Sequence, residues 1–266
     1  MLAPHVRRTP HRVVRARVGR WVRAAAAAAA IAGVAACGGS GATDPGGSSA
    51  SAASRFTAGA PAGWWSGSNP DGQYAVGTDQ GIVHGGARSA SIRSLAVGAT
   101  SAQFGVLGQA VRADAYRGKR VRLSGWVRTD GALVDGAGVW LRIDGLGTGL
   151  LLDNSGGRRV TGTTDWRQVQ AVLDVPAEAD ALVFGVLLIG NGQGWFDDLA
   201  LDVVGPDVPT TLAYPGTPST DIATVATMRE YYATVPLTPT DLGFEGGASA
   251  ARGPLAALRL GTAPRP

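Results

Sequence analysis

Apolar and polar residues alternate strictly along several segments of this chain, and that alternation limits its secondary structure. In Val121–Arg128 the apolar residues and one glycine occupy the odd positions, and the even positions carry Arg122, Ser124, Trp126 and Arg128. A period of two places successive side chains on opposite faces of an extended strand. We therefore predict a half-buried strand with Trp126 and Arg128 on its outer face.

The same alternation recurs elsewhere. Val139, Leu141 and Ile143 alternate with Trp140, Arg142 and Asp144, which predicts a second strand with a polar and aromatic outer face. Ala181–Ile189 is almost continuously apolar, which indicates a central strand covered on both faces. The remaining expected strands are Arg88–Leu95, Ala102–Val111, Gln168–Val175 and Trp195–Val204.

These segments give at least seven strands, and no convincing amphipathic helix lies between them. A parallel sheet needs crossover helices, so the pattern favours an antiparallel arrangement. Two residues typical of helices are scarce, with one lysine and three glutamates in the whole chain, whereas glycine occurs 40 times. We predict an all-β fold, an antiparallel β-sandwich over residues 57–205.

A basic and then apolar leader precedes this domain. Residues 1–23 carry seven arginines and no acidic residue, and residues 24–36 are apolar. A membrane-spanning helix needs about 20 apolar residues, so this stretch has the length of the apolar part of a signal peptide instead. Val34–Gly38 resembles a bacterial lipobox. Residues 1–37 are therefore predicted to be a lipoprotein signal peptide that ends at a lipidated Cys37.

Two further features favour lipid attachment at Cys37. It is the chain's one cysteine, and it has no disulfide partner. Residues 38–56 are rich in Gly, Ser and Ala and predict a flexible tether. The resemblance implies an exported protein held by acyl chains at a bacterial membrane, facing the periplasm or the cell exterior. The alternative is an ordinary secretory signal cleaved elsewhere, with Cys37 incidental.

The positive net charge of the chain belongs to the leader. Seven of the 24 basic residues and none of the 20 acidic ones lie before Cys37, which leaves 17 basic residues and a net charge of −3 for the rest. A protein that binds a phosphate backbone normally presents an excess of basic residues. The composition therefore argues against nucleic acid as a partner.

Three segments follow one another within Gly63–Val204: Tyr116–Trp126 (YRGKRVRLSGW), Gly162–Trp166 (GTTDW) and Trp195–Leu199 (WFDDL). In order and spacing they resemble galactose-binding-like β-sandwich domains of the type found in jelly-roll carbohydrate-binding modules. The resemblance implies a jelly-roll sandwich that binds a ligand without catalysis, and for many members that ligand is a sugar. The fold alone does not fix the function.

Related sandwiches often hold a structural calcium ion through carboxylate and carbonyl oxygens. Asp197 matches the acidic position of that site, so the resemblance implies calcium as the one candidate cofactor. The alternative is an aspartate that only accepts hydrogen bonds within a turn. Asp197 and Asp198 are neighbours in a strand and are expected to point to opposite faces.

The tryptophans are the best candidates for sugar binding. An indole offers a flat apolar surface to a pyranose ring, and charged side chains bind the hydroxyls of the sugar. All six tryptophans after the leader lie in the predicted sandwich. The candidate carbohydrate-binding residues are Trp126, Arg128, Trp140, Arg142 and Asp144 in one outer strip, with Trp64 and Trp65 on a preceding loop. The alternative is that Trp126 and Trp140 are covered and that Arg128 and Arg142 pair with aspartates. Trp166, which opens a strand, is assigned to structure.

The sequence offers little material for catalysis. His84 is the one histidine after the leader, and the aspartates at 144, 153, 197 and 198 show no pairing pattern of a glycoside hydrolase. We therefore predict no enzymatic activity and a lipid-anchored binding module. Its partner is carbohydrate or, in the alternative, a protein of the cell envelope; a hydrolase is the third reading.

Residues 206–266 are expected to form a proline-rich, largely irregular tail. Ile222–Ala233 is the one plausible helix, with N-cap candidates at Ser219, Thr220 and Asp221. Thr240–Glu245 resembles a strand that opens this kind of sandwich. It either folds back as the missing first strand or begins a second module.

Overall fold

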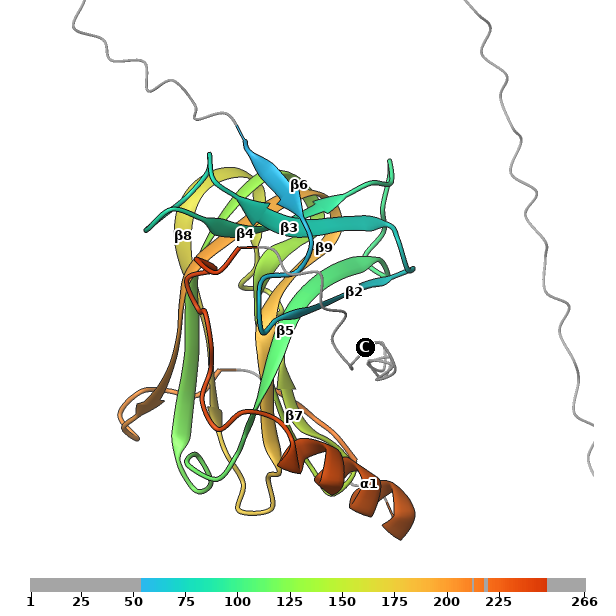
Figure 1. The fold of residues 1–266 in the computed structure, drawn as a ribbon, viewed down its shortest axis with the longest axis vertical. Helices are drawn as coiled ribbons and strands as arrows, with labels where there is room; N and C mark the ends of the chain where they lie inside the picture. The colour runs from blue at the N-terminus through green and yellow to red at the C-terminus, as the bar shows by residue number, and fades with distance from the viewer. Residues whose placement is uncertain (1–53, 212, 218–219, 248–266) are drawn as a thin grey trace, which may run out of the picture. The chain divides into compact units, whose positions relative to one another are not determined.

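The computed structural model describes residues 54–211, 213–217 and 220–247, so the predicted signal peptide with Cys37 lies outside the described residues. The described part is an all-β, antiparallel jelly-roll β-sandwich with one helix, which confirms the predicted fold class (Figure 1). Its elements are β1 (Phe56–Ala58), β2 (Trp65–Asn69), β3 (Tyr74–Asp79), β4 (Ser89–Ser94), β5 (Phe104–Arg112), β6 (Arg120–Gly145), β7 (Thr148–Asp153), β8 (Val160–Asp174), β9 (Ala181–Val204), β10 (Tyr214–Pro215) and α1 (Ile222–Ala233).

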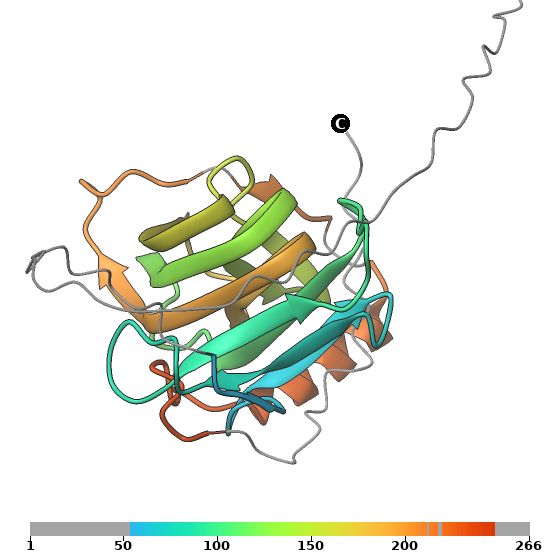
Figure 2. The same cartoon turned by 90° about the horizontal axis from the view of Figure 1, so that it is seen from above.

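Two long strands, β6 and β9, pair with each other along nearly their whole length and form the centre of the sandwich. Their ladder joins one group of strands, β2, β5, β7 and β10, through residues 136–145 and 181–189. It joins the other group, β1, β3, β4 and β8, mainly through residues 120–130 and 193–196. Figure 2 shows the same strands from above.

The ladder between β6 and β9 bends in the middle. Its register shifts between Asp130 and Leu133 and again between Val134 and Gly136. Gly192 has a φ of 101°, and a Cβ there would lie 2.4 Å from the carbonyl oxygen of Gly131. Bulges and glycines of this kind turn a strand from one layer into the other. The segments predicted as four separate strands are therefore the two halves of β6 and the two halves of β9.

The main core lies between the two layers. Val121, Leu123 and Val127 of β6 are fully buried in it, as their alternation predicts. The apolar run of β9 is covered on both faces, which confirms the interpretation of this segment as a central strand: Phe184 belongs to the main core and Val183 to a second cluster on the opposite face.

The helix occurs at the predicted residues. The side chain of Asp221 caps α1 by accepting hydrogen bonds from the backbone nitrogens of Ala223 and Thr224, both at 3.2 Å. A side-chain oxygen at this position satisfies donors that have no partner within the helix. No helix within the described ranges is long and apolar enough to cross a membrane.

The segment after α1 folds back onto the sandwich. Phe244 is fully buried, with its ring 4.9 Å from that of Trp64. The backbone nitrogen of Leu199 donates to the carbonyl of Leu242 at 3.0 Å, and the Trp64 indole donates to the carbonyl of Asp241 at 3.1 Å. The return itself was one of the two predicted outcomes. Its form differs, because the segment is built of turns and not of a strand.

Candidate functional site

Three aromatic rings meet on the outer face of the layer that contains β8. The imidazole of His84 stacks on the indole of Trp126, with centroids 4.2 Å apart and planes 16° from parallel. The same imidazole meets the indole of Trp166 edge-on at 5.5 Å. Both tryptophans are half-buried, so each keeps part of its surface in contact with solvent. We call Trp126, Trp166 and His84 the aromatic platform.

Strand register places the two tryptophans near each other. Trp126 of β6 lies opposite Gln168 of β8, so Trp166 is its diagonal neighbour on the same face. His84 comes from the connection between β3 and β4. Its backbone nitrogen donates to Asp197 Oδ2 at 2.8 Å, and that of Gly85 donates to the same oxygen at 3.1 Å. Asp197 therefore holds the loop that carries the imidazole.

Charged side chains surround the platform. His84 Nδ1 lies 2.7 Å from Asp198 Oδ2, and the Asp198 side chain is 46% exposed. Arg128 lies 3.6 Å from Asp165, whose side chain is 86% exposed. Exposed carboxylates and a guanidinium beside flat rings can bind hydroxyl groups while the rings take up apolar faces.

The expectation that Asp197 and Asp198 point to opposite faces does not hold, because both carboxylates approach His84: Asp197 Oδ2 accepts from its backbone nitrogen at 2.8 Å, and Asp198 Oδ2 lies 2.7 Å from its Nδ1. The register between β6 and β9 shifts opposite these two residues, so the alternation of a regular strand is interrupted there. Asp197 is fully buried, and its Oδ1 accepts from the backbone nitrogen of Asp198 at 2.8 Å. Burial raises the pKa of Asp197 to about 6, against the opposing effect of the hydrogen bonds from His84, Gly85 and Asp198. A buried carboxylate resists ionisation because it loses the solvation of its charge.

The oxygens of Asp197 already accept hydrogen bonds from the backbone. Both of its oxygens accept backbone N–H groups, whereas calcium requires six to eight oxygen ligands. In the part of the chain that the structure describes, no group of three or more His, Cys, Asp or Glu residues could hold a metal ion. The geometry favours the hydrogen-bonded alternative; calcium binding at Asp197 stays a prediction.

The expected outer strip does not form one exposed surface. Trp140 and Asp144 are 3% and 2% exposed, and α1 and the residues that follow it pack against them. Arg142 binds Asp144 through Nε at 2.6 Å and Nη2 at 2.7 Å. Trp140 thus belongs to a covered cluster, while Trp126 stacks on His84 and Arg128 pairs with Asp165. The expectation that these side chains share an open strip is wrong, because the sequence pattern does not show where α1 packs.

The two tryptophans at 64 and 65 also separate. Trp64 is 3% exposed and packs against Phe184 and Phe244 in the main core. Trp65 begins β2, is half-buried, and lies 5.9 Å from the ring of Trp140. Sugar binding by any of the predicted residues stays a prediction, and the accessible ones are Trp126 and Arg128.

Three members of the accessible site were not among the predicted binding residues, namely His84, Trp166 and Asp198. His84 was considered only for catalysis, and Trp166 was assigned to structure. The contact between His84 and Trp126 joins residues 42 positions apart, and no spacing rule indicates it. Asp198 has a φ of 47°, an unusual value for a residue other than glycine.

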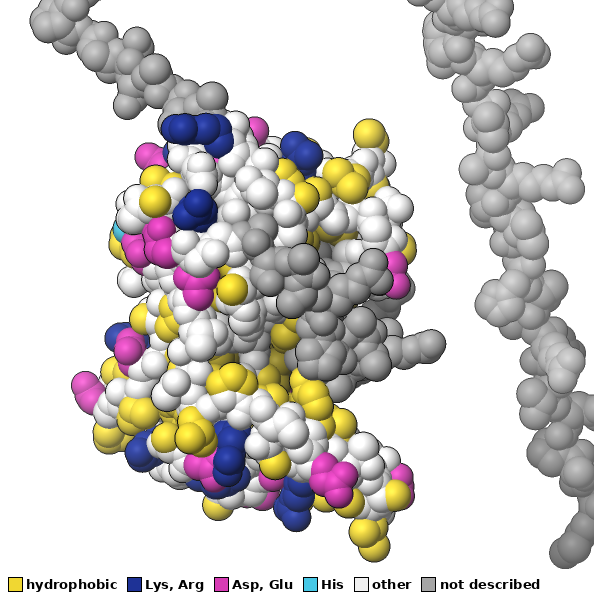
Figure 3. All heavy atoms as spheres, viewed as in Figure 1, with side chains coloured by type: hydrophobic (Ala, Val, Ile, Leu, Met, Phe, Trp, Pro, Cys, Tyr) yellow, Lys and Arg dark blue, Asp and Glu magenta, His cyan; other side chains and the backbone are white. Residues whose placement is uncertain are grey.

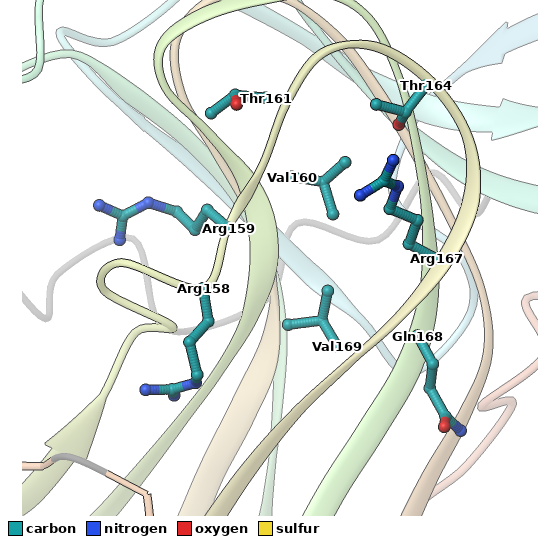
Figure 4. Close-up of a pocket in the computed structure, with 8 residues that line it drawn as sticks. All are labelled: Arg158, Arg159, Val160, Thr161, Thr164, Arg167, Gln168 and Val169. Atoms are coloured by element: carbon teal, nitrogen blue, oxygen red, sulfur yellow. The ribbon is translucent and has the colours of Figure 1, made fainter.

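A separate hollow of about 340 Å³ lies along the curve of β8 (Figure 4). Val160 and Val169 face each other across it, and Arg158, Arg159 and Arg167 are at its rim. Arg158 is held by the buried Asp153 at 2.6 Å and Arg159 by Asp135 at 3.4 Å. The guanidinium groups of Arg158 and Arg159 point away from Arg167, so the three charges do not converge on one point.

The surface seen in Figure 3 mixes basic and acidic side chains without a broad field of one sign. Hydrophobic side chains gather on this face in its lower part, around α1. This distribution agrees with the near-neutral charge of the chain after the leader.

Comparison with known proteins yields one curated relative. No family model matches the chain. Over 157 residues, which is 58% of this chain, it is 40% identical to the uncharacterized HTH-type transcriptional regulator YbfP of Bacillus subtilis. The chain spans about half the length of that relative, 52%.

Solved structures with a similar arrangement share little sequence with the chain. The CBM22-1 xylan-binding domain of Paenibacillus barcinonensis Xyn10C is 13% identical, with a TM-score of 0.39, and the match covers 55% of this chain and 88% of that one. The Stig cyclase Fisc of Fischerella sp. TAU is 15% identical, with a TM-score of 0.41, and covers 61% and 90%. The module TmCBM61 is 15% identical, with a TM-score of 0.33, and covers 55% and 92%. At these values the likenesses assign neither ligand nor activity to this chain.

Proposed function

We propose that this chain is a non-catalytic carbohydrate-binding module and that it holds its ligand on the aromatic platform. The observation that carries the proposal is the meeting of half-buried Trp126 and Trp166 around His84, with exposed Asp198 and Asp165 beside them. Flat rings next to hydrogen-bonding groups can bind a sugar, because a pyranose has an apolar C–H face and a rim of hydroxyls.

Each part of the platform has a defined task in this proposal. The indoles of Trp126 and Trp166 supply apolar contact. Asp198 accepts hydrogen bonds from sugar hydroxyls, and Arg128 donates to sugar oxygens. Asp197 positions the loop of His84 from below, through backbone nitrogens, and does not reach the ligand.

The proposal includes the predicted lipid anchor. Cys37 carries the acyl chains, and the Gly/Ser/Ala-rich segment after it separates the sandwich from a bacterial membrane. The tether was predicted to run to residue 56, but β1 already begins at Phe56. One acyl chain alone gives reversible membrane binding, whereas several together anchor a protein stably. An anchored module of this kind would collect extracellular or cell-wall glycan at the cell surface. This part of the proposal rests on the sequence.

The test is a binding screen with the full chain carrying Cys37→Ser, which prevents lipid attachment. The probes are xylohexaose, β-1,4-galactotriose and a panel of soluble polysaccharides, measured by isothermal titration calorimetry. Trp126→Ala and Trp166→Ala are each expected to weaken binding at least about tenfold, which corresponds to about 1.4 kcal/mol.

Tyr214→Ala is the matched control, because Tyr214 is an exposed aromatic residue on β10, which joins the other group of strands through β7. It should leave affinity unchanged. If none of the probes binds, or if binding persists undiminished in both tryptophan variants, the platform is not a sugar site. The remaining interpretation would then be an interaction domain for an envelope protein.

A further inference from the structure

The helix α1 lies against the outer face of the layer formed by β2, β5, β9 and β6, away from the aromatic platform. Figure 1 shows it at the lower end of the molecule, near β7, and it contacts β5 and β6. The contact uses the end of the helix: Met228, Tyr231 and Tyr232 belong to the covered cluster together with Trp140. Tyr232 is the one buried residue of α1, whereas Ile222 at its start is 84% exposed. The helix is thus held by one end.

The sheet face beneath this helix has two neighbouring glycines between two tryptophans. Across β2, β5, β9 and β6 the register aligns Trp65, Gly108, Gly185 and Trp140. Both indoles lean over Gly108: a Cβ there would lie 2.5 Å from Cζ2 of Trp65 and 2.8 Å from Cζ2 of Trp140. Two tryptophans therefore face each other over bare backbone.

The two indoles leave their hydrogen-bond donors unused. The Nε1 atoms of Trp65 and Trp140 are both buried and have no acceptor among the described residues. A buried donor without a partner costs about 1–3 kcal/mol, so native proteins rarely retain two side by side. A bound oxygen atom that accepted hydrogen bonds from the two indole nitrogens would remove this cost.

An acceptor and a guanidinium lie on the same face. Arg142 holds both oxygens of Asp144, at 2.6 Å and 2.7 Å, and Asp180 donates its backbone nitrogen to the Asp144 carbonyl at 2.7 Å. The hydroxyl of Tyr232 donates to Asp144 Oδ2. The Tyr232 hydroxyl of α1 thus donates a hydrogen bond to the carboxylate of the Arg142–Asp144 ion pair.

From these contacts we infer that α1 is a displaceable cap over a second binding face formed by Trp65, Trp140, Arg142 and Asp144. The ligand class is a neutral, hydroxyl-rich molecule such as an oligosaccharide. Its hydroxyl takes the position of the Tyr232 phenol on Asp144, and its oxygens accept from the two indole nitrogens. The helix and the ligand therefore compete for one carboxylate. This site is separate from the aromatic platform and does not depend on it.

The competition has a quantitative consequence. A ligand that binds only the uncapped form shows an affinity reduced by the fraction of molecules in that form. Removing the Tyr232 hydroxyl weakens the cap and leaves Trp65, Trp140, Arg142 and Asp144 intact. The affinity at this face should then rise, which is the opposite of what loss of a ligand-contacting group would give.

The experiment uses the full chain with Cys37→Ser and Trp126→Ala, so that the platform does not contribute. The probes are xylohexaose, cellohexaose and maltohexaose, measured by isothermal titration calorimetry. Tyr232→Phe keeps the ring and removes the hydroxyl, and it is expected to tighten binding of a probe at least about tenfold. Ile222→Ala, in the exposed first turn of the same helix, is the matched control and should change nothing.

Two additional measurements identify the face. Adding Trp140→Phe to Tyr232→Phe should remove the gain in affinity, and saturating probe should raise hydrogen exchange of the α1 amides in the parent. Equal affinity for every probe in the parent and in Tyr232→Phe, or the absence of any binding in both, would overturn the inference. Binding by the chain with Cys37→Ser alone that is absent after Trp126→Ala and is not restored by Tyr232→Phe would also overturn the inference and would leave the platform as the one binding site.

Discussion

The imidazole of His84 and the indole of Trp126 lie nearly parallel, 4.2 Å apart between centroids. The stack joins a loop residue to a strand residue, and the carboxylate of Asp198 fixes the imidazole from the side at 2.7 Å. A single loop residue therefore orders both the ring surface and the polar rim of the platform.

Replacing His84 by Ala should disorder the platform without unfolding the protein. Loss of one stacked ring pair is expected to cost about 0.5–1.5 kcal/mol in the free energy of unfolding, measured by urea denaturation. The protein should stay folded, so a fall in glycan affinity would come from the platform itself. We expect that fall because Trp126 and Trp166 both lose their contact with His84. Unchanged affinity in a folded His84→Ala protein would contradict the role given to this ring.

Asp197 predicts a pH dependence of stability. Its pKa in the folded protein is raised to about 6 from 3.8, so the native state binds this proton more tightly than the unfolded state. The stabilising contribution is complete below about pH 3.8 and is lost as the pH rises through about 6, a change of about 3 kcal/mol. Urea denaturation at several pH values between 3.5 and 7 measures it.

Asp197→Asn should flatten that dependence, since the substituted side chain does not titrate. Asp165→Asn serves as the control, because the Asp165 side chain is 86% exposed. Between pH 4 and pH 6, the free energy of unfolding should fall more in the wild-type protein than in Asp197→Asn. An equal fall in both proteins would refute the raised pKa of Asp197.

Gly108→Ala is predicted to destabilise the sandwich by about 1–3 kcal/mol, because the new methyl group would overlap two rigid indoles at 2.5 Å and 2.8 Å. Gly67→Ala on β2 is the matched control. Its Cβ would meet only a methyl group of Val106 at 3.7 Å, an ordinary contact. Thermal unfolding of both variants compares them directly; equal melting temperatures would show that the indoles move aside freely.

Phe244→Ala tests whether the segment that returns after α1 is part of the sandwich. A fully buried phenylalanine against Trp64 is expected to contribute about 3–5 kcal/mol to the free energy of unfolding. Urea denaturation gives the loss, with Leu237→Ala as the control, because Leu237 lies in the same segment after α1 and is 57% exposed. A loss below about 1 kcal/mol would mean that the segment rests on the sandwich without stabilising it.

The strands were predictable because one side chain in two faces the core, and the alternation in Val121–Arg128 records this directly. The joining of two predicted strands into β6 was not, since the bulge near Val134 depends on its pairing with β9. The helix was predictable from its cap at Asp221. Where α1 packs was not, because most of its residues are exposed and Tyr232 alone is buried.

The accessible site shows the same division. Trp126 and Arg128 were identified because a strand period places them outside, which is a local property. The partnership of Trp126 with His84 and Trp166 depends on where a distant loop and a neighbouring strand lie, and a single sequence contains no direct record of that. Trp140 shows the converse: the period places it outside correctly, and only tertiary packing covers it.

The bent pair of β6 and β9 has a mechanical consequence. Because the same two strands run through both layers, neither layer can peel away while the other stays intact. Pulling on one layer loads the backbone hydrogen bonds of the other through a continuous ladder. Under force, tension would be shared across the whole sandwich, and the domain should yield in one step.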